Sequence, residues 1–251
     1  MITQIRCPVC NSNSAPLDVV DFNKSCEELR QKYLPLSQKP IYYFLCENCH
    51  FCFAPEIYNW TISEFEEKIY NNQYIEIDPD YVENRPTANA KHLIHLFDNQ
   101  KQLIRHLDYG GGSGLLSQLL REQDWQSITY DPFYNKETNL KNLGKFDLIT
   151  AYEVFEHVPN VDKLMSNLSF LLNDNGIILF STLLSDGQIE KNKRIQWWYA
   201  SPRNGHISLF SKKSLSILAN NSGFTLGSFS TGFHAMWKLV PQWANHIIKI
   251  N

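Results

Sequence analysis

Two short cysteine motifs near the start of the chain have the spacing of a metal site. Cys7 and Cys10 lie in "CPVC", and Cys46 and Cys49 lie in "CENC". Two cysteines three positions apart can direct both sulfur atoms toward one ion, and two such turns complete the tetrahedral coordination of zinc. We therefore predict a zinc site with four cysteine ligands, Cys7, Cys10, Cys46 and Cys49.

The residue that follows each motif supports this pairing. Asn11 and His50 occupy a position that often needs a left-handed backbone, which asparagine and histidine tolerate better than most residues. This favours Cys46 with Cys49 over Cys49 with Cys52. Disulfide bonds, or reduced cysteines without a metal, are the alternatives, and a redox-active pair fits less well because neither motif joins a strand to a helix. Four thiolates leave no open coordination position, so a structural role is expected.

The segment "LDYGGGSGLL", residues 107–116, concentrates glycine directly after an apolar stretch. Glycine loses much backbone entropy when it is ordered, so such a cluster indicates a tight turn or a close approach to a ligand. The third glycine of the dinucleotide-binding Gly-x-Gly-x-x-Gly fingerprint is missing, and no P-loop lysine follows Gly114. The pattern is instead Asp-x-Gly-x-Gly-x-Gly, formed by Asp108, Gly110, Gly112 and Gly114.

Short apolar runs alternate with helical patterns from about residue 101 onward. We expect strands at residues 102–110, 127–131, 146–153, 177–183 and 224–230, and helices at residues 115–123, 160–176 and 211–223. This alternation predicts an α/β fold with a mainly parallel sheet and helices on both faces. Ligands of such sheets bind at the carboxyl ends of the strands, which is where the glycine cluster lies.

Three motifs together resemble class I S-adenosylmethionine-dependent methyltransferases. They are the glycine pattern at 108–114, the acid Asp131 at the end of the second expected strand, and "FDLITAYEVFEHVPN". Their order and spacing fit the family over roughly residues 90 to 235. The resemblance implies a Rossmann-like sheet that binds S-adenosylmethionine, with Asp131 on the ribose hydroxyls and Glu153 beside the methionine end. The implied cofactor-binding residues are Asp108, Gly110, Gly112, Gly114, Asp131 and Glu153.

The sequence departs from the family between the second and fourth strands of its pattern. Only fourteen residues separate Asp131 from Phe146. This length leaves little room for the usual second helix and third strand. We expect a reduced sheet edge there, which puts contacts to the adenine ring from this region in doubt.

The segment "IQWWYASPRNGHISLF" is the candidate acceptor side. Its Gly-His pair is similar to one in sugar methyltransferases that carry an N-terminal zinc module. That resemblance implies His206 as general base with Tyr199 assisting, and Glu153 is a further catalytic candidate. A histidine held by the backbone for structural reasons is the alternative for His206. His157 is interpreted as orienting its loop, and Arg203 is suited to a substrate phosphate or carboxylate.

The chain is expected to have three parts. Residues 1–56 form a zinc-binding module, 57–100 a helical connector, and 101–251 the S-adenosylmethionine-binding domain. In the connector, a Ser63–Glu66 capping box starts one helix and a second runs from Pro86 to about Asp98. Its three tyrosines are interpreted as packing on the main domain, with a lid over the active site as the alternative; they are Tyr70, Tyr74 and Tyr81.

Composition limits the function classes. Lys and Arg total 23 against 26 Asp and Glu, with no basic run, so nucleic acid is not an expected partner. No secretory leader or membrane-length apolar stretch is recognised, and a cytoplasmic protein is expected.

The function predicted from the sequence is methyl transfer from S-adenosylmethionine to oxygen, carbon or nitrogen of a small molecule, such as a nucleotide-linked sugar or a biosynthetic intermediate. Two alternatives stay open. One is a non-catalytic protein that binds zinc and a nucleoside, and the other is a nicotinamide-dependent oxidoreductase. The oligomeric state is left open.

Overall fold

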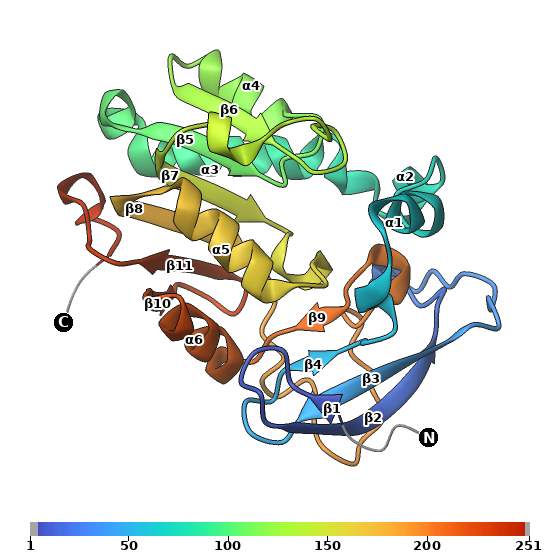
Figure 1. Cartoon of the computed structure of the whole chain (residues 1–251). Coiled ribbons are helices and arrows are strands. Elements are labelled where there is room, and N and C mark those ends of the chain that lie inside the picture. Colours follow the sequence, from blue (N-terminus) through green and yellow to red (C-terminus); the bar gives the residue numbers. More distant parts are fainter. Residues whose placement is uncertain (1–4, 249–251) are drawn as a thin grey trace. The chain divides into compact units, whose positions relative to one another are not determined.

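The computed structural model describes residues 5–248, and this part of the chain divides into two compact units (Figure 1). The first unit holds residues 5–79, 155–164 and 182–218, and the second holds 80–154, 165–181 and 219–248. Packing therefore groups the chain differently from the three consecutive segments expected above, whose division by function stays a prediction. The outermost residues of the expected first and last segments, 1–4 and 249–251, lie outside the described part.

The first unit contains a sheet in which all neighbouring strands are antiparallel. Its order is β1-β2-β3-β4-β9. The strands are β1 (Ile5–Arg6), β2 (Asn13–Asp21), β3 (Pro40–Cys46), β4 (Cys52–Phe53) and β9 (Ser208–Leu209). The last strand comes from the C-terminal half of the sequence, and it pairs with β4 through Cys52 and Phe53.

The first unit also contains several short helices. They are η1 (Cys26–Arg30), η2 (Ile57–Asn59), α1 (Ile62–Lys68), α2 (Tyr74–Ile77), η6 (Phe155–His157) and η7 (Pro202–Asn204). The capping box predicted for α1 was wrong by two residues. Thr61 Oγ1 accepts from the Glu64 amide at 3.2 Å, and the Glu64 carboxylate accepts from the Thr61 amide at 2.8 Å. Thr61 has extended backbone and precedes the helix, whereas Ser63 lies inside it.

The second unit contains a six-stranded sheet with the order β10-β11-β8-β7-β5-β6. Strands β5 to β8 are parallel, and β11 is antiparallel to both of its neighbours. The strands are β5 (Arg105–Tyr109), β6 (Gln126–Tyr130), β7 (Phe146–Tyr152), β8 (Leu172–Ser181), β10 (Thr225–Ser228) and β11 (Phe233–Trp237). The predicted α/β architecture is confirmed.

The predicted reduction of one sheet edge is also confirmed. Between β6 and β7 the described chain forms only the short helix η5 (Leu140–Asn142), and β6 is the last strand of the sheet on that side.

Helices cover both faces of this sheet. On one face, α3 (Asn84–Phe97) and α4 (Leu115–Arg121) pack on a core that includes Leu93, Phe97, Leu120, Trp125, Leu148 and Leu179. On the opposite face, Asn167 of α5 (Val161–Leu171) donates to Tyr109 Oη at 3.0 Å. The remaining helices are η3 (Pro79–Tyr81), η4 (Asp98–Leu103), α6 (Lys212–Asn221) and η8 (Gln242–Ala244).

Two predicted helix ends were wrong. The helix expected to end at Gly176 ends at Leu171, because Leu172 already begins β8 and pairs with Phe146. The helix expected to begin at Pro86 begins two residues earlier, at Asn84. Proline is tolerated there because the first-turn amides have no partner within the helix.

Candidate functional site

The glycine-rich loop joins β5 to α4 at the carboxyl end of the parallel strands. A Cβ atom on Gly110 would lie 2.5 Å from Val154 Cγ2, and one on Gly111 would lie 2.1 Å from Asp108 Oδ2. A Cβ atom on Gly112 would meet nothing within 4 Å. The loop therefore packs tightly underneath and leaves open space beside Gly112. Left-handed backbone, with φ of +76°, +55° and +88°, occurs at Gly110, Gly112 and Gly114.

Asp108 ends a chain of buried hydrogen bonds below this loop. Thr150 Oγ1 donates to Asp108 Oδ1 at 2.8 Å, and His106 Nε2 lies 3.0 Å from the same threonine oxygen. A threonine hydroxyl has one proton, so Nε2 of His106 donates and its Nδ1 accepts from Ser127 Oγ at 2.7 Å. Burial lowers the pKa of His106 to about 3, which keeps this ring neutral. The sequence patterns did not indicate the role of His106 or Thr150.

Burial also raises the pKa of the Asp108 carboxyl from its ordinary 3.8 to about 7, and the nearby charge of Asp131 acts in the same direction. The folded protein therefore keeps a proton on Asp108 at pH values where the unfolded chain has lost it. The stability that this proton contributes is fully present below pH 4 and is lost as the pH rises through 7.

We predict that Asp108→Asn removes this pH dependence. Between pH 5 and pH 8 the wild-type protein is expected to lose about 3 kcal/mol more unfolding free energy than the variant. Urea unfolding of both proteins at the two pH values measures the difference. Equal losses in the two proteins would contradict the raised pKa.

Asp131 is buried, with 7% of its surface exposed, and holds both its own turn and the glycine loop. Its Oδ2 accepts from the Gly112 amide at 3.0 Å, and its Oδ1 accepts from the amides of Phe133 and Tyr134 at 2.8 and 3.3 Å. A carboxylate has about four acceptor positions, so these bonds leave one for a ligand. Asp131 thus stabilises the turn that follows it, and the ribose-binding role stays a prediction.

Thr129 supplies a polar atom that fits a bound ligand. Its Oγ1 is buried and has no hydrogen-bond partner among the described residues, and it lies 3.1 Å from the position of a Cβ atom on Gly114. Buried hydroxyls without a partner are rare in native proteins. The open space beside Gly112 and the hydroxyl of Thr129 fit a ligand that carries polar groups. S-adenosylmethionine is such a ligand.

Glu153 follows β7 with a strained backbone. Its φ is +53°, which is uncommon for a residue other than glycine and is often found at functional sites. The Glu153 amide donates to Ser181 Oγ at 2.8 Å, and Ser181 Oγ donates to Glu153 Oε1 at 2.7 Å. Ser181 at the end of β8 thus holds this carboxylate at the carboxyl ends of the strands.

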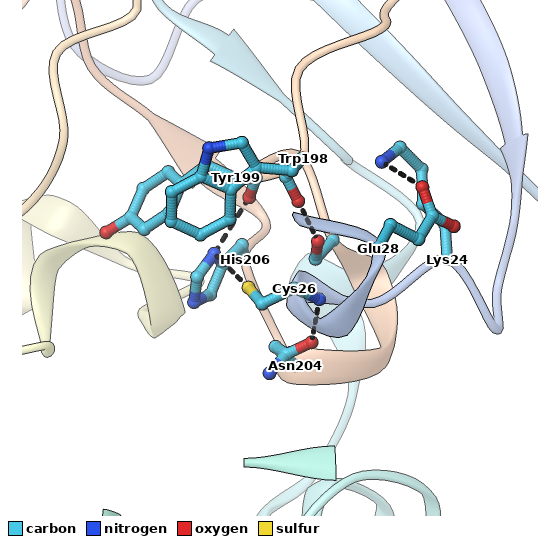
Figure 2. A network of polar contacts seen from close by, with 8 residues as sticks. Lys24, Cys26, Glu28, Trp198, Tyr199, Asn204 and His206 are labelled. Carbon is cyan, nitrogen blue, oxygen red and sulfur yellow. Dashed lines mark hydrogen bonds and ion pairs between the residues drawn. The ribbon is translucent and has the colours of Figure 1, made fainter. Parts of the chain in front are cut away.

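His206 lies at the centre of a buried polar network in the first unit (Figure 2). Its Nδ1 atom is 2.8 Å from the carbonyl oxygen of Tyr199 and 3.8 Å from Sγ of Cys26. A carbonyl only accepts, so Nδ1 carries the proton and the neutral ring has its lone pair on Nε2. This is the tautomer that a general base acting through Nε2 needs. A structural histidine would make the same bond, and the general-base role of His206 stays a prediction.

Neighbouring residues fix the position of this histidine. Asn204 Oδ1 accepts from the Cys26 amide at 2.9 Å (Figure 2), and Tyr43 Oη donates to the His206 carbonyl at 2.7 Å. Gly205 has φ of +87°, and a Cβ atom there would lie 3.1 Å from His157 Nδ1. The glycine before His206 therefore permits the close approach of a second histidine.

His157 and Tyr199 complete a cluster with Glu156 in the first unit. Tyr199 Oη donates to Glu156 Oε1 at 2.5 Å, and Tyr70 Oη lies 3.2 Å from His157 Nδ1. The rings of His157 and His206 are 4.8 Å apart between centroids. Tyr199 is thereby held against the candidate base.

Two tyrosines of the expected connector contact this part of the chain. Tyr70 bonds to His157, and Tyr74 Oη donates to the Asn204 carbonyl at 3.4 Å. Both belong to the first unit, whereas Tyr81 belongs to the second. The packing role predicted for the tyrosines is present for Tyr70 and Tyr74.

Arg203 is buried, with 5% of its surface exposed. Its Nη1 donates to the Ile69 carbonyl at 3.0 Å, and its Nη2 lies 3.5 Å from Asn71 Oδ1. Burial lowers the pKa of this guanidinium below its ordinary value. The bonds within the described chain account for its position, and a role toward a substrate anion stays a prediction.

The four predicted zinc ligands form one compact group in the first unit. The sulfur atoms of Cys7, Cys10, Cys46 and Cys49 all lie within 4.8 Å of one another. Cys7 and Cys49 are 3.6 Å apart and Cys10 and Cys46 are 3.4 Å apart, too far for disulfide bonds. Four thiolates around one zinc ion have sulfur atoms about 3.8 Å apart, so the group fits zinc.

The turns that carry these cysteines have the predicted geometry. Asn11 and His50 have left-handed backbone, with φ of +56° and +57°. The contact between the two thiols lowers the pKa of Cys7 to about 6 and raises that of Cys49, so Cys7 is the first of the pair to form a thiolate. Cys52 is buried outside the group, as expected from the preference for Cys46 with Cys49.

A family model described as a methyltransferase domain matches residues 81–228, which is more than half of the chain. The chain belongs to this methyltransferase family. The match confirms the resemblance to class I S-adenosylmethionine-dependent methyltransferases, and it includes the glycine loop, Asp131, Glu153 and His206. Among the described residues, no helix is long and apolar enough to cross a membrane.

Relatives of this methyltransferase include ubiquinone biosynthesis O-methyltransferases. The protein from Histophilus somni is 31% identical over 105 residues, covering 31% of this chain and 44% of the relative. A Coxiella burnetii protein is 28% identical over 126 residues, and the match covers 41% of this chain and 48% of the relative. The chain thus spans less than half the length of these relatives. A solved structure, the 1,6-didemethyltoxoflavin-N1-methyltransferase of Burkholderia thailandensis with bound S-adenosylhomocysteine, has 16% identity and a TM-score of 0.48, covering 82% and 96% of the two chains.

Proposed function

We propose that the chain transfers a methyl group from S-adenosylmethionine to an oxygen of a small-molecule acceptor. The observation that carries this proposal is the glycine loop of a methyltransferase family member, which leaves open space beside Gly112. Oxygen is preferred to carbon and nitrogen because the curated relatives are O-methyltransferases. When bound, S-adenosylmethionine supplies a methyl group already activated on a sulfonium.

The chain's own residues hold the cofactor in this proposal. The amides of the loop and the carboxylate of Asp131 bind its polar groups, and Asp108 supports the loop from below. Glu153, whose carboxylate is held by Ser181, contacts the methionine end of the cofactor. A cationic ligand favours the charged form of the Asp108 carboxyl, so binding is expected to release a proton near neutral pH.

His206 removes the proton from the hydroxyl group of the acceptor. Its Nδ1–H is fixed on the Tyr199 carbonyl, so Nε2 accepts the proton of the acceptor hydroxyl. The Tyr199 ring, whose centroid is 4.2 Å from that of His206, holds the imidazole in place. A nucleotide-linked sugar or another hydroxylated biosynthetic intermediate is the acceptor class we propose, and the four-cysteine group is a structural zinc site.

His206→Ala is expected to lower kcat by about 100-fold or more, the usual contribution of a general base, while leaving S-adenosylmethionine affinity unchanged. The acceptor is first found by screening hydroxylated metabolites, nucleotide-linked sugars among them, for transfer of a labelled methyl group. Cys26→Ala is the matched control, because it removes the weaker contact to Nδ1 and keeps the bond to the carbonyl.

Near-full turnover by His206→Ala would remove the base role and leave the structural interpretation. Tight cofactor binding without transfer to any acceptor of the screen would favour the non-catalytic alternative.

A further inference from the structure

We propose that Glu156, His157 and His206 form a second metal site, separate from the four cysteines, that takes a divalent first-row cation such as zinc. One ligand atom from each of these residues lies within 4.8 Å of the others, and all three residues belong to the first unit. Three ligand atoms bound to one zinc ion lie about 3.3 Å apart. The three ligand atoms are therefore already close to the separation that one bound cation requires.

The hydrogen bonds around the three side chains are those that metal ligands need. A metal-binding histidine usually donates its other ring N–H to a carbonyl, carboxylate or hydroxyl, which orients the ring. His206 Nδ1 donates to the Tyr199 carbonyl, and His157 Nδ1 lies 3.2 Å from Tyr70 Oη. The third ligand is oriented as well, because Glu156 Oε1 accepts from Tyr199 Oη.

The backbone also brings the ligands together. Glu156 and His157 lie in η6, and the carbonyl of Glu156 accepts from the Ile207 amide at 2.9 Å, next to His206. Gly205 has no Cβ atom, so the His157 ring can lie close to the backbone beside His206. Glu156 and His206 are buried, with 0% and 4% of their surface exposed, so a cation bound here is shielded from solvent.

The donor set defines the kind of cation. Two imidazoles and one carboxylate suit zinc and other first-row divalent ions and leave a coordination position open, whereas magnesium and calcium prefer oxygen ligands. A nitrogen that coordinates a metal cannot accept a proton. The site therefore goes beyond the proposed function, since its occupancy excludes the base role of His206 and would inhibit methyl transfer.

Cobalt(II) tests the site directly, because its spectrum distinguishes thiolate ligands from nitrogen and oxygen ligands. The chain is first loaded with one zinc per chain, which the four thiolates of the cysteine group bind, and is then titrated with Co²⁺. We expect visible d–d absorption without a thiolate charge-transfer band, saturating at one Co²⁺ per chain. His157→Gln and Glu156→Gln should weaken this binding at least tenfold, and His95→Gln, which changes an exposed histidine outside the cluster, should not.

Zinc content is measured in each variant, and one zinc per chain retained at the cysteines shows that the first unit is folded. Absence of the thiolate-free spectrum at millimolar Co²⁺, or its retention in both cluster variants, would overturn the proposal. S-adenosylmethionine titration is read separately, so failure of the metal site and failure of the methyltransferase assignment are distinguished.

Discussion

Cys49→Ala is expected to release zinc and to lower the free energy of unfolding of the first unit by at least about 3 kcal/mol. Zinc binding to a structural site of this kind contributes about 10 kcal/mol or more in small modules, and much of it is lost with one ligand. The four cysteines join the turn after β1 to the turn after β3, so the metal fixes the end of the sheet. Elemental analysis and urea unfolding measure the two effects.

Cys52→Ala is the matched control for this experiment. Cys52 and Cys49 are both 0% exposed and lie three positions apart, but Cys52 is outside the four-cysteine group. The control should keep one zinc per chain and lose only the packing of a small side chain, about 1 kcal/mol. Equal destabilisation by the two variants, with well under one zinc in the wild-type protein, would show that the cysteines act as buried apolar residues.

Gly112→Ala is expected to weaken S-adenosylmethionine binding by at least tenfold, which corresponds to about 1.4 kcal/mol. A Cβ atom at this position meets no protein atom within 4 Å and extends into the space proposed for the cofactor. The φ of +55° adds backbone strain of about 1 kcal/mol, which affects stability. Calorimetric titration measures the affinity.

Gly223→Ala separates these two contributions. Gly223 also has left-handed backbone, with φ of +76°, and a Cβ atom there also meets nothing within 4 Å, but it follows α6 and lies outside the loop. Both variants should lose similar stability, and only Gly112→Ala should lose affinity. Equal affinities in the two variants would mean that the cofactor does not lie beside Gly112.

Features with local conformational requirements were predictable from the sequence. Three of the four glycines of the loop have left-handed backbone, and so do Asn11 and His50 after the cysteine motifs. Such requirements follow from the residue's own steric limits, so a short pattern is enough to recognise them. The reduced sheet edge followed from chain length alone, because fourteen residues cannot form both a helix and a strand with their turns.

Features that depend on long-range pairing were not predictable. Strand β2 was missed because Pro16 and the bulge before Asp18 interrupt its pattern, and β3 stabilises it by pairing. The residues around the candidate base come from distant positions, since Tyr70 contacts His157, and His157 meets His206 only in the folded unit. The predicted end of α5 was wrong for another reason. The apolar pair Leu171–Leu172 fits both a helix and a strand, so the sequence does not mark where the helix stops.

Calorimetric titration of the zinc-replete protein with S-adenosylmethionine, with NAD as the competing ligand, tests most directly whether the glycine loop binds the methyl donor. We predict one binding site per chain with micromolar affinity, displaced by S-adenosylhomocysteine and unaffected by NAD. Absence of binding in folded protein that holds its zinc, or binding of NAD in its place, would contradict the assignment of the glycine loop as a methyl-donor site.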